Sequence, residues 1–169
     1  MEKKGSLEIQ QDMKFNDGAH KVKLVGKLLL LLIIIAVLVG FTGYGPVSKY
    51  KTGDARAGVV ITTQQYVRYE SPLEVEMRVN TVLLGVDSVL DISFPGSYID
   101  DIKVESIVPE PDHTVISNDR IVFRFAIKDP GEEQRILFYL RPKGLFKSVE
   151  ATVTIGERME AHLEHFIYP

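Results

Sequence analysis

The sequence contains no cysteine and no tryptophan among its 169 residues. Without thiols, the chain has no disulfide framework, no thiol nucleophile, no thiolate zinc site and no cysteine-held iron–sulfur cluster. A formal charge of −3, from 20 basic and 23 acidic side chains, argues against a polycation made to bind nucleic acid. The motifs of nucleophile-elbow hydrolases, zinc metalloproteases and phosphate-binding loops are absent as well. We therefore expect no enzyme, no cofactor and no nucleic-acid partner.

One long apolar run dominates the N-terminal third of the chain. Residues 28–41 read LLLLLIIIAVLVGF, and Lys27 and Lys49 bracket 21 uncharged residues. At about 1.5 Å per residue, this stretch is long enough to cross a hydrocarbon core of roughly 30 Å. A buried core helix would keep one polar face, and a cleaved signal peptide would follow a shorter leader than 27 residues. The pattern predicts an uncleaved, membrane-spanning signal anchor over residues 28–48.

The charges on the two sides of this stretch predict its orientation. Residues 1–27 carry six basic and four acidic side chains, whereas residues 49–169 carry fourteen basic and nineteen acidic ones. Basic residues favour the cytoplasmic side of a membrane. We expect a single-pass protein of the cell membrane with a cytoplasmic N-terminus and a C-terminal domain outside the cytoplasm. A cysteine-free domain in that location favours a prokaryotic source.

The C-terminal part of the sequence alternates apolar and polar residues, as half-buried strands do. In residues 73–79, the apolar side chains are Leu73, Val75, Met77 and Val79. Similar alternation covers residues 90–94, 102–108, 121–127, 136–140, 149–155 and 161–168, and residues 98–101 resemble a helical turn. Proline- and glycine-containing turns separate these segments, and no long amphipathic helix interrupts them.

Short strands at this spacing predict an all-β domain. The expected fold is an immunoglobulin-like antiparallel β-sandwich of seven to eight strands, without the cysteine–tryptophan core of antibody domains, preceded by one transmembrane helix. The chain then divides into a cytoplasmic tail (1–27), a transmembrane helix (28–48), a linker (49–57) and an extracytoplasmic sandwich (58–169). A small barrel is the alternative architecture.

A basic patch is the candidate partner-binding site. If residues 121–127 pair with residues 136–140 through a turn at 129–131, several basic side chains and one tyrosine share an outer face. Such a patch suits an acidic partner or a lipid headgroup surface. The alternative is an ordinary charged face with acidic cross-strand neighbours. The patch comprises Arg120, Arg124, Arg135, Tyr139 and Arg141.

Two sets of side chains resemble metal ligands. His162 and His165 lie three residues apart, which places them on opposite faces of the expected strand, so we expect two exposed histidines on an edge strand. His113 has no predicted link to them. Several acids also offer oxygen ligands, but they lack the spacing of a calcium loop and are expected to be solvated turn carboxylates. These acids are Asp87, Asp91, Asp100, Asp101 and Glu105.

Two apolar segments break the alternation. The triplet Val82-Leu83-Leu84, with Val86, is expected to be buried, with an exposed binding patch as the alternative. Leu145 and Phe146 follow a Pro-Lys-Gly turn, and two readings stay open: a loop plug or an exposed tip.

These features favour a non-enzymatic, single-pass membrane protein. Its sandwich is expected to bind or scaffold another membrane or envelope protein, as an accessory subunit held in the lipid bilayer. The alternative is a ligand- or metal-binding sensory or accessory domain of the cell envelope.

Overall fold

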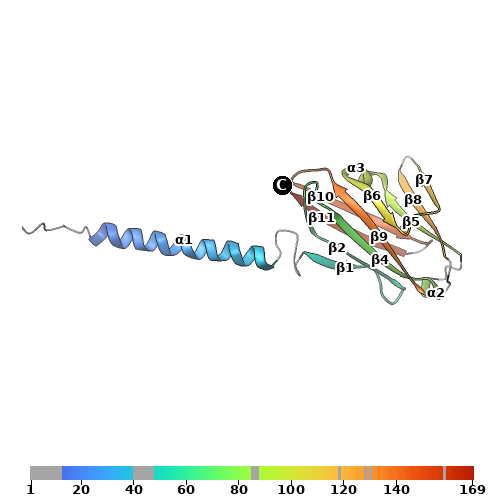
Figure 1. Ribbon diagram of the computed structural model, residues 1–169, viewed down its shortest axis with the longest axis horizontal. Coiled ribbons are helices and arrows are strands. Elements are labelled where there is room, and N and C mark those ends of the chain that lie inside the picture. Colours follow the sequence, from blue (N-terminus) through green and yellow to red (C-terminus); the bar gives the residue numbers. More distant parts are fainter. Residues whose placement is uncertain are drawn as a thin grey trace, which may run out of the picture. The chain divides into compact units, whose positions relative to one another are not determined.

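The computed structural model describes residues 13–39, 48–84, 88–117, 119–127, 129, 131–157 and 159–169. The chain separates into two compact units, Met1–Leu38 and Val39–Pro169. The first contains helix α1, and the second contains all of the strands (Figure 1).

Helix α1 spans Met13–Val39 and carries the apolar run of the sequence. The leucines and isoleucines from Leu28 to Ile35 are all about half exposed, and no polar residue interrupts this run. Among the described residues, no helix is both long and apolar enough to cross a membrane. The predicted anchor over residues 28–48 includes residues 40–47, and the predicted tail includes residues 1–12. These two segments lie outside the described residues, so the anchor, the tail and the membrane location stay predictions.

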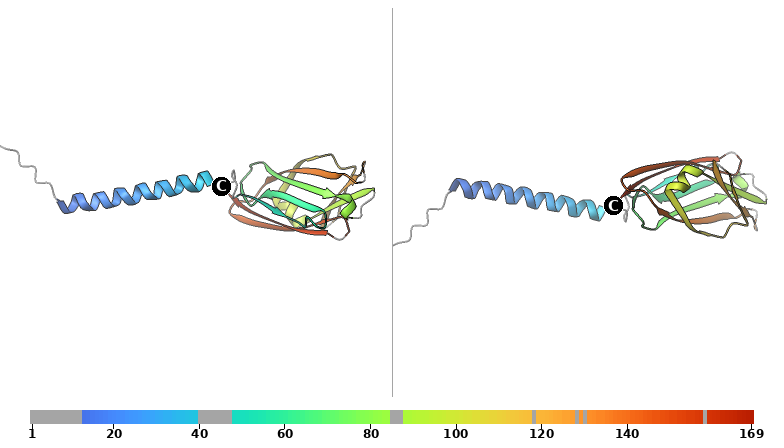
Figure 2. Two further views of the ribbon diagram at one scale, coloured as in Figure 1. Left: turned by 90° about the horizontal axis from the view of Figure 1, so that it is seen from below. Right: turned by 90° about the horizontal axis from the view of Figure 1, so that it is seen from above.

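The second unit is a sandwich of two β-sheets. The first sheet has the strand order β1-β2-β4-β9-β6, and the second has the order β3-β11-β10-β5-β8-β7. Two short helices, α2 (Thr81–Leu84) and α3 (Gly96–Asp101), connect strands, and α3 crosses from the second sheet to the first (Figure 2, right). The strands are β1 (Lys49–Thr52), β2 (Val59–Gln64), β3 (Tyr66–Arg68), β4 (Leu73–Asn80), β5 (Val89–Pro95), β6 (Ile102–Val108), β7 (His113–Ile116), β8 (Arg120–Ala126), β9 (Glu133–Pro142), β10 (Lys147–Ile155) and β11 (Met159–Tyr168).

The antiparallel β-sandwich is confirmed, but the expected number of strands is wrong. The described residues form eleven strands, in sheets of five and six, rather than the seven or eight of an immunoglobulin-like arrangement. All paired neighbours are antiparallel except β3 and β11, which run parallel. Strands β1 and β3 contain only four and three residues, so neither is long enough to show an alternating pattern in the sequence.

The core lies between the two sheets and follows the predicted alternation. Along β4 the side chains are buried and exposed in turn, and the same holds over most of β9, β10 and β11. Phe138 of the first sheet packs against Phe94 of the second, with ring centroids 5.1 Å apart, and against Phe123 at 5.6 Å. These aromatic contacts join the two sheets, because edge-to-face rings fill the space between them.

The sandwich begins directly at Ser48. Residues 49–57 were expected to be a linker, but Lys49–Thr52 forms strand β1, which pairs with β2. Ser48 is fully buried, and its hydroxyl donates to the carbonyl of Tyr66 over 3.1 Å. The hydroxyl of Tyr50 donates to the Glu164 carbonyl at 3.0 Å and accepts from the Glu164 amide at 2.6 Å, which ties β1 to the second sheet. The predicted linker is therefore wrong over β1.

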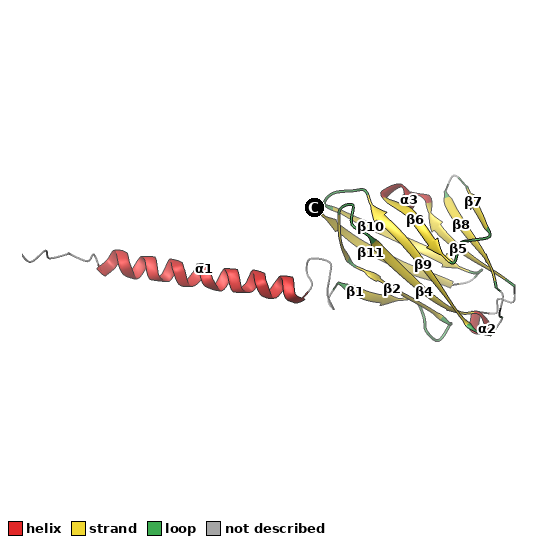
Figure 3. Cartoon of the chain, viewed as in Figure 1, coloured by secondary structure: helices red, strands yellow, loops and turns green. Residues whose placement is uncertain are grey.

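The two ends of the sandwich differ. We call the end that contains Ser48, the start of β4 and the ends of β9 and β11 the Ser48 end, and the opposite one, where β4 runs into α2, the α2 end. Figure 3 shows the start of β1 and the C-terminus at one end and α2 at the other.

Candidate functional site

The predicted basic patch is divided between the two sheets. Strand β8, with Arg120 and Arg124, lies in the second sheet between β5 and β7. Strand β9, with Arg135, Tyr139 and Arg141, lies in the first sheet between β4 and β6. The expected pairing of residues 121–127 with residues 136–140 is therefore wrong. Alternation identifies the inward face of each strand, but it does not identify the neighbouring strand, and here the chain changes sheets between β8 and β9.

The arginines of the second sheet have partners on that sheet. Arg124 donates two hydrogen bonds of 2.8 Å to the carboxylate of Asp91, directly across on β5. The hydrogen bond from this guanidinium lowers the pKa of Asp91 and raises that of Arg124. Arg120 donates to the hydroxyls of Ser93 and Thr154 over 2.8 and 2.7 Å. These contacts are the cross-strand neighbours of an ordinary charged sheet face.

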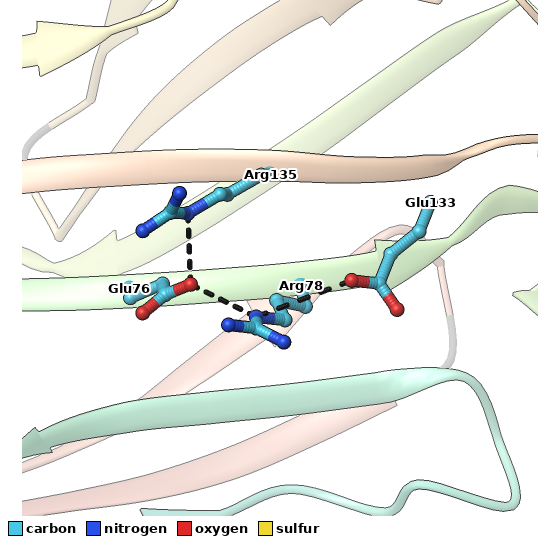
Figure 4. A network of polar contacts seen from close by, with 4 residues as sticks. All are labelled: Glu76, Arg78, Glu133 and Arg135. Atoms are coloured by element: carbon cyan, nitrogen blue, oxygen red, sulfur yellow. Dashed lines mark hydrogen bonds and ion pairs between the residues drawn. The ribbon is translucent and has the colours of Figure 1, made fainter.

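The arginines of the first sheet are paired in the same way. Arg141 donates to both carboxylate oxygens of Glu105 over 2.5 and 3.1 Å, and this hydrogen bond lowers the pKa of Glu105. Glu76 accepts from both Arg78 and Arg135, each over 2.8 Å, and the hydrogen bond from Arg78 is the main cause of its lowered pKa (Figure 4). Glu133 lies 4.0 Å from Arg78 and completes the network (Figure 4). A role for these arginines in partner binding stays a prediction.

The two C-terminal histidines have unlike surroundings. They lie on opposite faces of β11 as expected, but only His162 is exposed, with its Nε2 3.9 Å from Glu150. His165 is fully buried, so the expectation of two exposed histidines is wrong. Its Nδ1 lies 2.6 Å from the carbonyl of Gln64 and its Nε2 lies 2.9 Å from the hydroxyl of Tyr98. Strand β11 also has a neighbour on each side, β10 and β3, so it is no edge strand.

The buried histidine is neutral, and its proton position follows from its contacts. A carbonyl only accepts, so Nδ1 carries the proton and donates to Gln64, and Nε2 accepts from the Tyr98 hydroxyl. Burial lowers the pKa of His165 to about 4 and raises that of Tyr98. Both groups are therefore uncharged near neutral pH. The sequence signal that could have placed His165 in the core is its position in an alternating strand, on the same face as Leu163 and Ile167.

The candidate acidic ligands do not converge. Asp91 and Glu105 pair with arginines, Asp101 receives two hydrogen bonds of 2.7 Å from Lys147, and Asp87 lies outside the described residues. In the part of the chain that the structure describes, no three His, Asp or Glu side chains are grouped to hold a metal ion.

A hollow lies on the outer face of the first sheet. Its lining combines one lysine, two glutamates and polar uncharged side chains, with no apolar floor such as small-molecule pockets usually have. The lining residues are Lys49, Thr62, Thr63, Gln64, Glu74 and Glu76.

Exposed apolar side chains occur at both ends of the sandwich and also on β7, at Val115 and Ile116. At the α2 end, the exposed fractions of Val82 and Leu83 are 65% and 59%, so the expected burial is wrong for these two residues. Strand β4 ends at Asn80, whose side-chain oxygen accepts from the Leu83 amide and starts the short helix. Val86 lies outside the described residues. At the Ser48 end, Leu145 and Phe146 form an exposed tip, with exposed fractions of 54% and 74%.

The comparisons with known proteins include a likeness to a solved structure. No family model matches the sequence, and no curated protein matches it. The solution structure of CaCohA2 from Clostridium acetobutylicum is similar over 64% of this chain and 89% of that chain, at 7% identity and a TM-score of 0.43.

Proposed function

We propose that this protein is a membrane-anchored, non-enzymatic β-sandwich that binds another membrane or envelope protein as an accessory subunit. The anchor is the predicted stretch from residue 28 up to Ser48, which itself belongs to the sandwich. The N-terminus is cytoplasmic, and the sandwich lies outside the cytoplasm. The observation that carries the binding role is the exposed pair Val82 and Leu83 at the α2 end, opposite the point where the proposed anchor joins the sandwich.

The anchor is supported by the apolar run of α1. Eight consecutive leucines and isoleucines, from Leu28 to Ile35, expose about half of each side chain. Burial of one such side chain contributes about 1.5–3 kcal/mol, so leaving eight of them in water is strongly unfavourable. The uncharged stretch continues in the sequence through residues 40–47 to Ser48, which gives the length that a span requires.

The binding role is supported by the location of exposed apolar surface. Outer-face arginines 124, 135 and 141 are each paired with a carboxylate, so these parts of the sheet faces are locally neutralised. Val82 and Leu83 are adjacent in sequence and stand on a helix of four residues. An exposed apolar pair at the end of the sandwich opposite Ser48 is well placed to meet a partner, because desolvation of such side chains is a common source of binding energy.

The anchor is tested by extraction of native membranes that contain the full chain. We expect the protein to remain in the membrane at alkaline pH and to leave it only with detergent. We also expect protease added outside intact cells to digest the sandwich. Release at alkaline pH would refute the anchor, and protection from external protease would refute the orientation.

The binding role is tested by purification of the full chain in mild detergent. We expect a protein partner in a fixed molar ratio, and its loss in the double variant Val82→Ser/Leu83→Ser. The matched control is Val115→Ser/Ile116→Ser, because these side chains of β7 are also exposed, by 51% and 76%, and also lie on the sandwich. Equal loss in both variants, or retention in both, would contradict a site at the α2 end. A soluble fragment for comparison must begin at Ser48, since a later start would remove part of β1.

A further inference from the structure

The loop between β9 and β10 presents apolar side chains to solvent on a constrained backbone. We call residues 143–146 the tip loop. Phe146 has a φ of 49°, in the left-handed region that residues other than glycine seldom adopt. This conformation is unfavourable for a phenylalanine, yet the ring is 74% exposed and gains little burial in return. An exposed aromatic side chain in such a conformation indicates a site that contacts something outside the fold.

Strand register places the tip loop at the Ser48 end. Lys49 of β1 is opposite Gln64 of β2, and Leu73 at the start of β4 is opposite Leu140 of β9. The sheet order puts β9 three strands from β1, about 14 Å away at roughly 4.8 Å per strand. Strand β9 continues past Leu140 to Pro142, so the tip loop projects beyond the start of β4.

The same end gathers tyrosines. Tyr66 lies on β3, Tyr168 ends β11, and the amide of Tyr69 donates to the carbonyl of Tyr168 over 2.7 Å. Each of these three side chains is partly exposed. Tyrosine is enriched where membrane meets water, since its ring is apolar and its hydroxyl is polar.

Charged side chains of both signs surround the tip loop. The exposed basic residues of this end include Lys49, Arg68, Lys143 and Lys147. Its acidic residues include the exposed Glu70 and Asp100 and the partly exposed Asp101. Lys143 donates to the Asp100 carbonyl over 3.2 Å, and Lys147 is paired with Asp101. The two lysines thus flank the apolar pair with their ammonium groups held toward α3, so the apolar centre has a charged rim of both signs.

We propose that the Ser48 end of the sandwich rests on the lipid bilayer, with Leu145 and Phe146 inserted among the headgroups. This inference rests on the proposed anchor. In the sequence, the uncharged stretch of the proposed anchor continues up to Ser48, which is buried in the sandwich. The proposed anchor therefore meets the sandwich at its Ser48 end, which would keep this end near the membrane surface. The bilayer is then the nearest apolar phase to Leu145 and Phe146.

The absence of tryptophan from the chain makes the test specific, because one introduced tryptophan is the only one in the protein. The variants Phe146→Trp and, as the matched control at the α2 end, Val82→Trp are each made in the full chain. They are reconstituted in phosphatidylcholine vesicles with and without phosphatidylglycerol, and with brominated lipid as the quencher. Alkaline extraction of the same vesicles reports separately whether the anchor is inserted.

The proposal predicts that Phe146→Trp gives blue-shifted emission that brominated lipid quenches several-fold more strongly than the emission of Val82→Trp. Solvent-like emission from both variants in extraction-resistant protein would overturn the tip-loop contact and leave the anchor intact. Blue-shifted emission without quenching would assign the loop to a protein contact, a second copy or a partner, and would also overturn it. Release of the protein at alkaline pH would overturn the anchor and this inference together.

A second probe guards against a Phe146→Trp variant that folds poorly. The chain has no cysteine, so Leu145→Cys carries a single nitroxide label and Val82→Cys carries the control. We expect the label at position 145 to be reached by oxygen in preference to a water-soluble nickel complex, and the label at position 82 to show the reverse. The same preference at both positions would overturn the proposal.

Discussion

Protonation of the buried His165 makes the stability of the sandwich depend on pH. In the folded chain its pKa is about 4, whereas a histidine in an unfolded chain has a pKa of about 6.5. The unfolded state therefore binds more protons than the folded one between these two values. The stabilisation is fully present above about pH 6.5 and is lost as the pH falls toward about 4.

The magnitude follows from the two pKa values. The difference between them, about 2.5, corresponds to a contribution of about 3 kcal/mol to the free energy of unfolding. About 2 kcal/mol of this contribution is lost by about pH 5. The main cause is burial of the ring, which disfavours its charged form. In addition, a second proton on Nε2 would face the hydroxyl of Tyr98, from which Nε2 now accepts a hydrogen bond. The hydroxyl would then have to rotate, and its own proton would lose its partner.

The perturbation is His165→Gln, measured in the sandwich fragment that begins at Ser48. Urea unfolding is followed by circular dichroism at about pH 7.5 and about pH 5. Between these pH values, we expect the free energy of unfolding to fall by about 2 kcal/mol more in the native fragment than in the variant. Comparison with the variant removes the contribution of the carboxylates. His162→Gln is the matched control on the exposed face of the same strand and should keep the native pH dependence. Equal losses in the native fragment and His165→Gln would refute the assignment.

Three further outcomes concern stability of the same fragment, each measured by urea unfolding. Phe138→Ala should lower the free energy of unfolding by about 3–5 kcal/mol, because Phe138 is fully buried between the sheets. Phe166→Ala, the control on the outer face, should lower it by less than about 1 kcal/mol. Gly58→Ala should cost about 1–3 kcal/mol, since φ is +87° and the new Cβ would lie 2.8 Å from Cβ of Leu83. Tyr50→Phe should cost about 1 kcal/mol, because it removes both hydrogen bonds to the backbone of β11. A neutral Phe138→Ala, Gly58→Ala or Tyr50→Phe would contradict the corresponding contact.

The sequence predicted the inward face of each long strand well. Alternation along residues 73–79 and 149–155 identified the buried side chains, because a side-chain period of two fixes which residues share a face. It did not identify strand neighbours, which is why Arg124 and Arg141 were placed on one surface and are found on two sheets. Neighbour choice depends on packing between distant segments, which a local pattern does not contain.

The exposed apolar residues were harder to interpret. Val82 and Leu83 were expected to be buried because they are apolar and consecutive, but Asn80 ends β4 and caps a short helix that leaves them outside. For Leu145 and Phe146 the sequence left a plug and an exposed tip open, and the structure shows the tip. Hydrophobicity alone does not separate a core residue from a contact residue.

The direct entry of the chain into β1 determines how the domain would respond to a mechanical load. A pull between the proposed anchor and a partner at the α2 end would act along β1, whose four residues pair antiparallel with β2. Force along a strand loads its ladder hydrogen bonds together in shear, whereas force across the strand would break them one after another. The bridge from Tyr50 to the backbone of β11 shares this load with the second sheet. The four-residue edge strand would thus act as a tether that transmits tension to both layers of the sandwich.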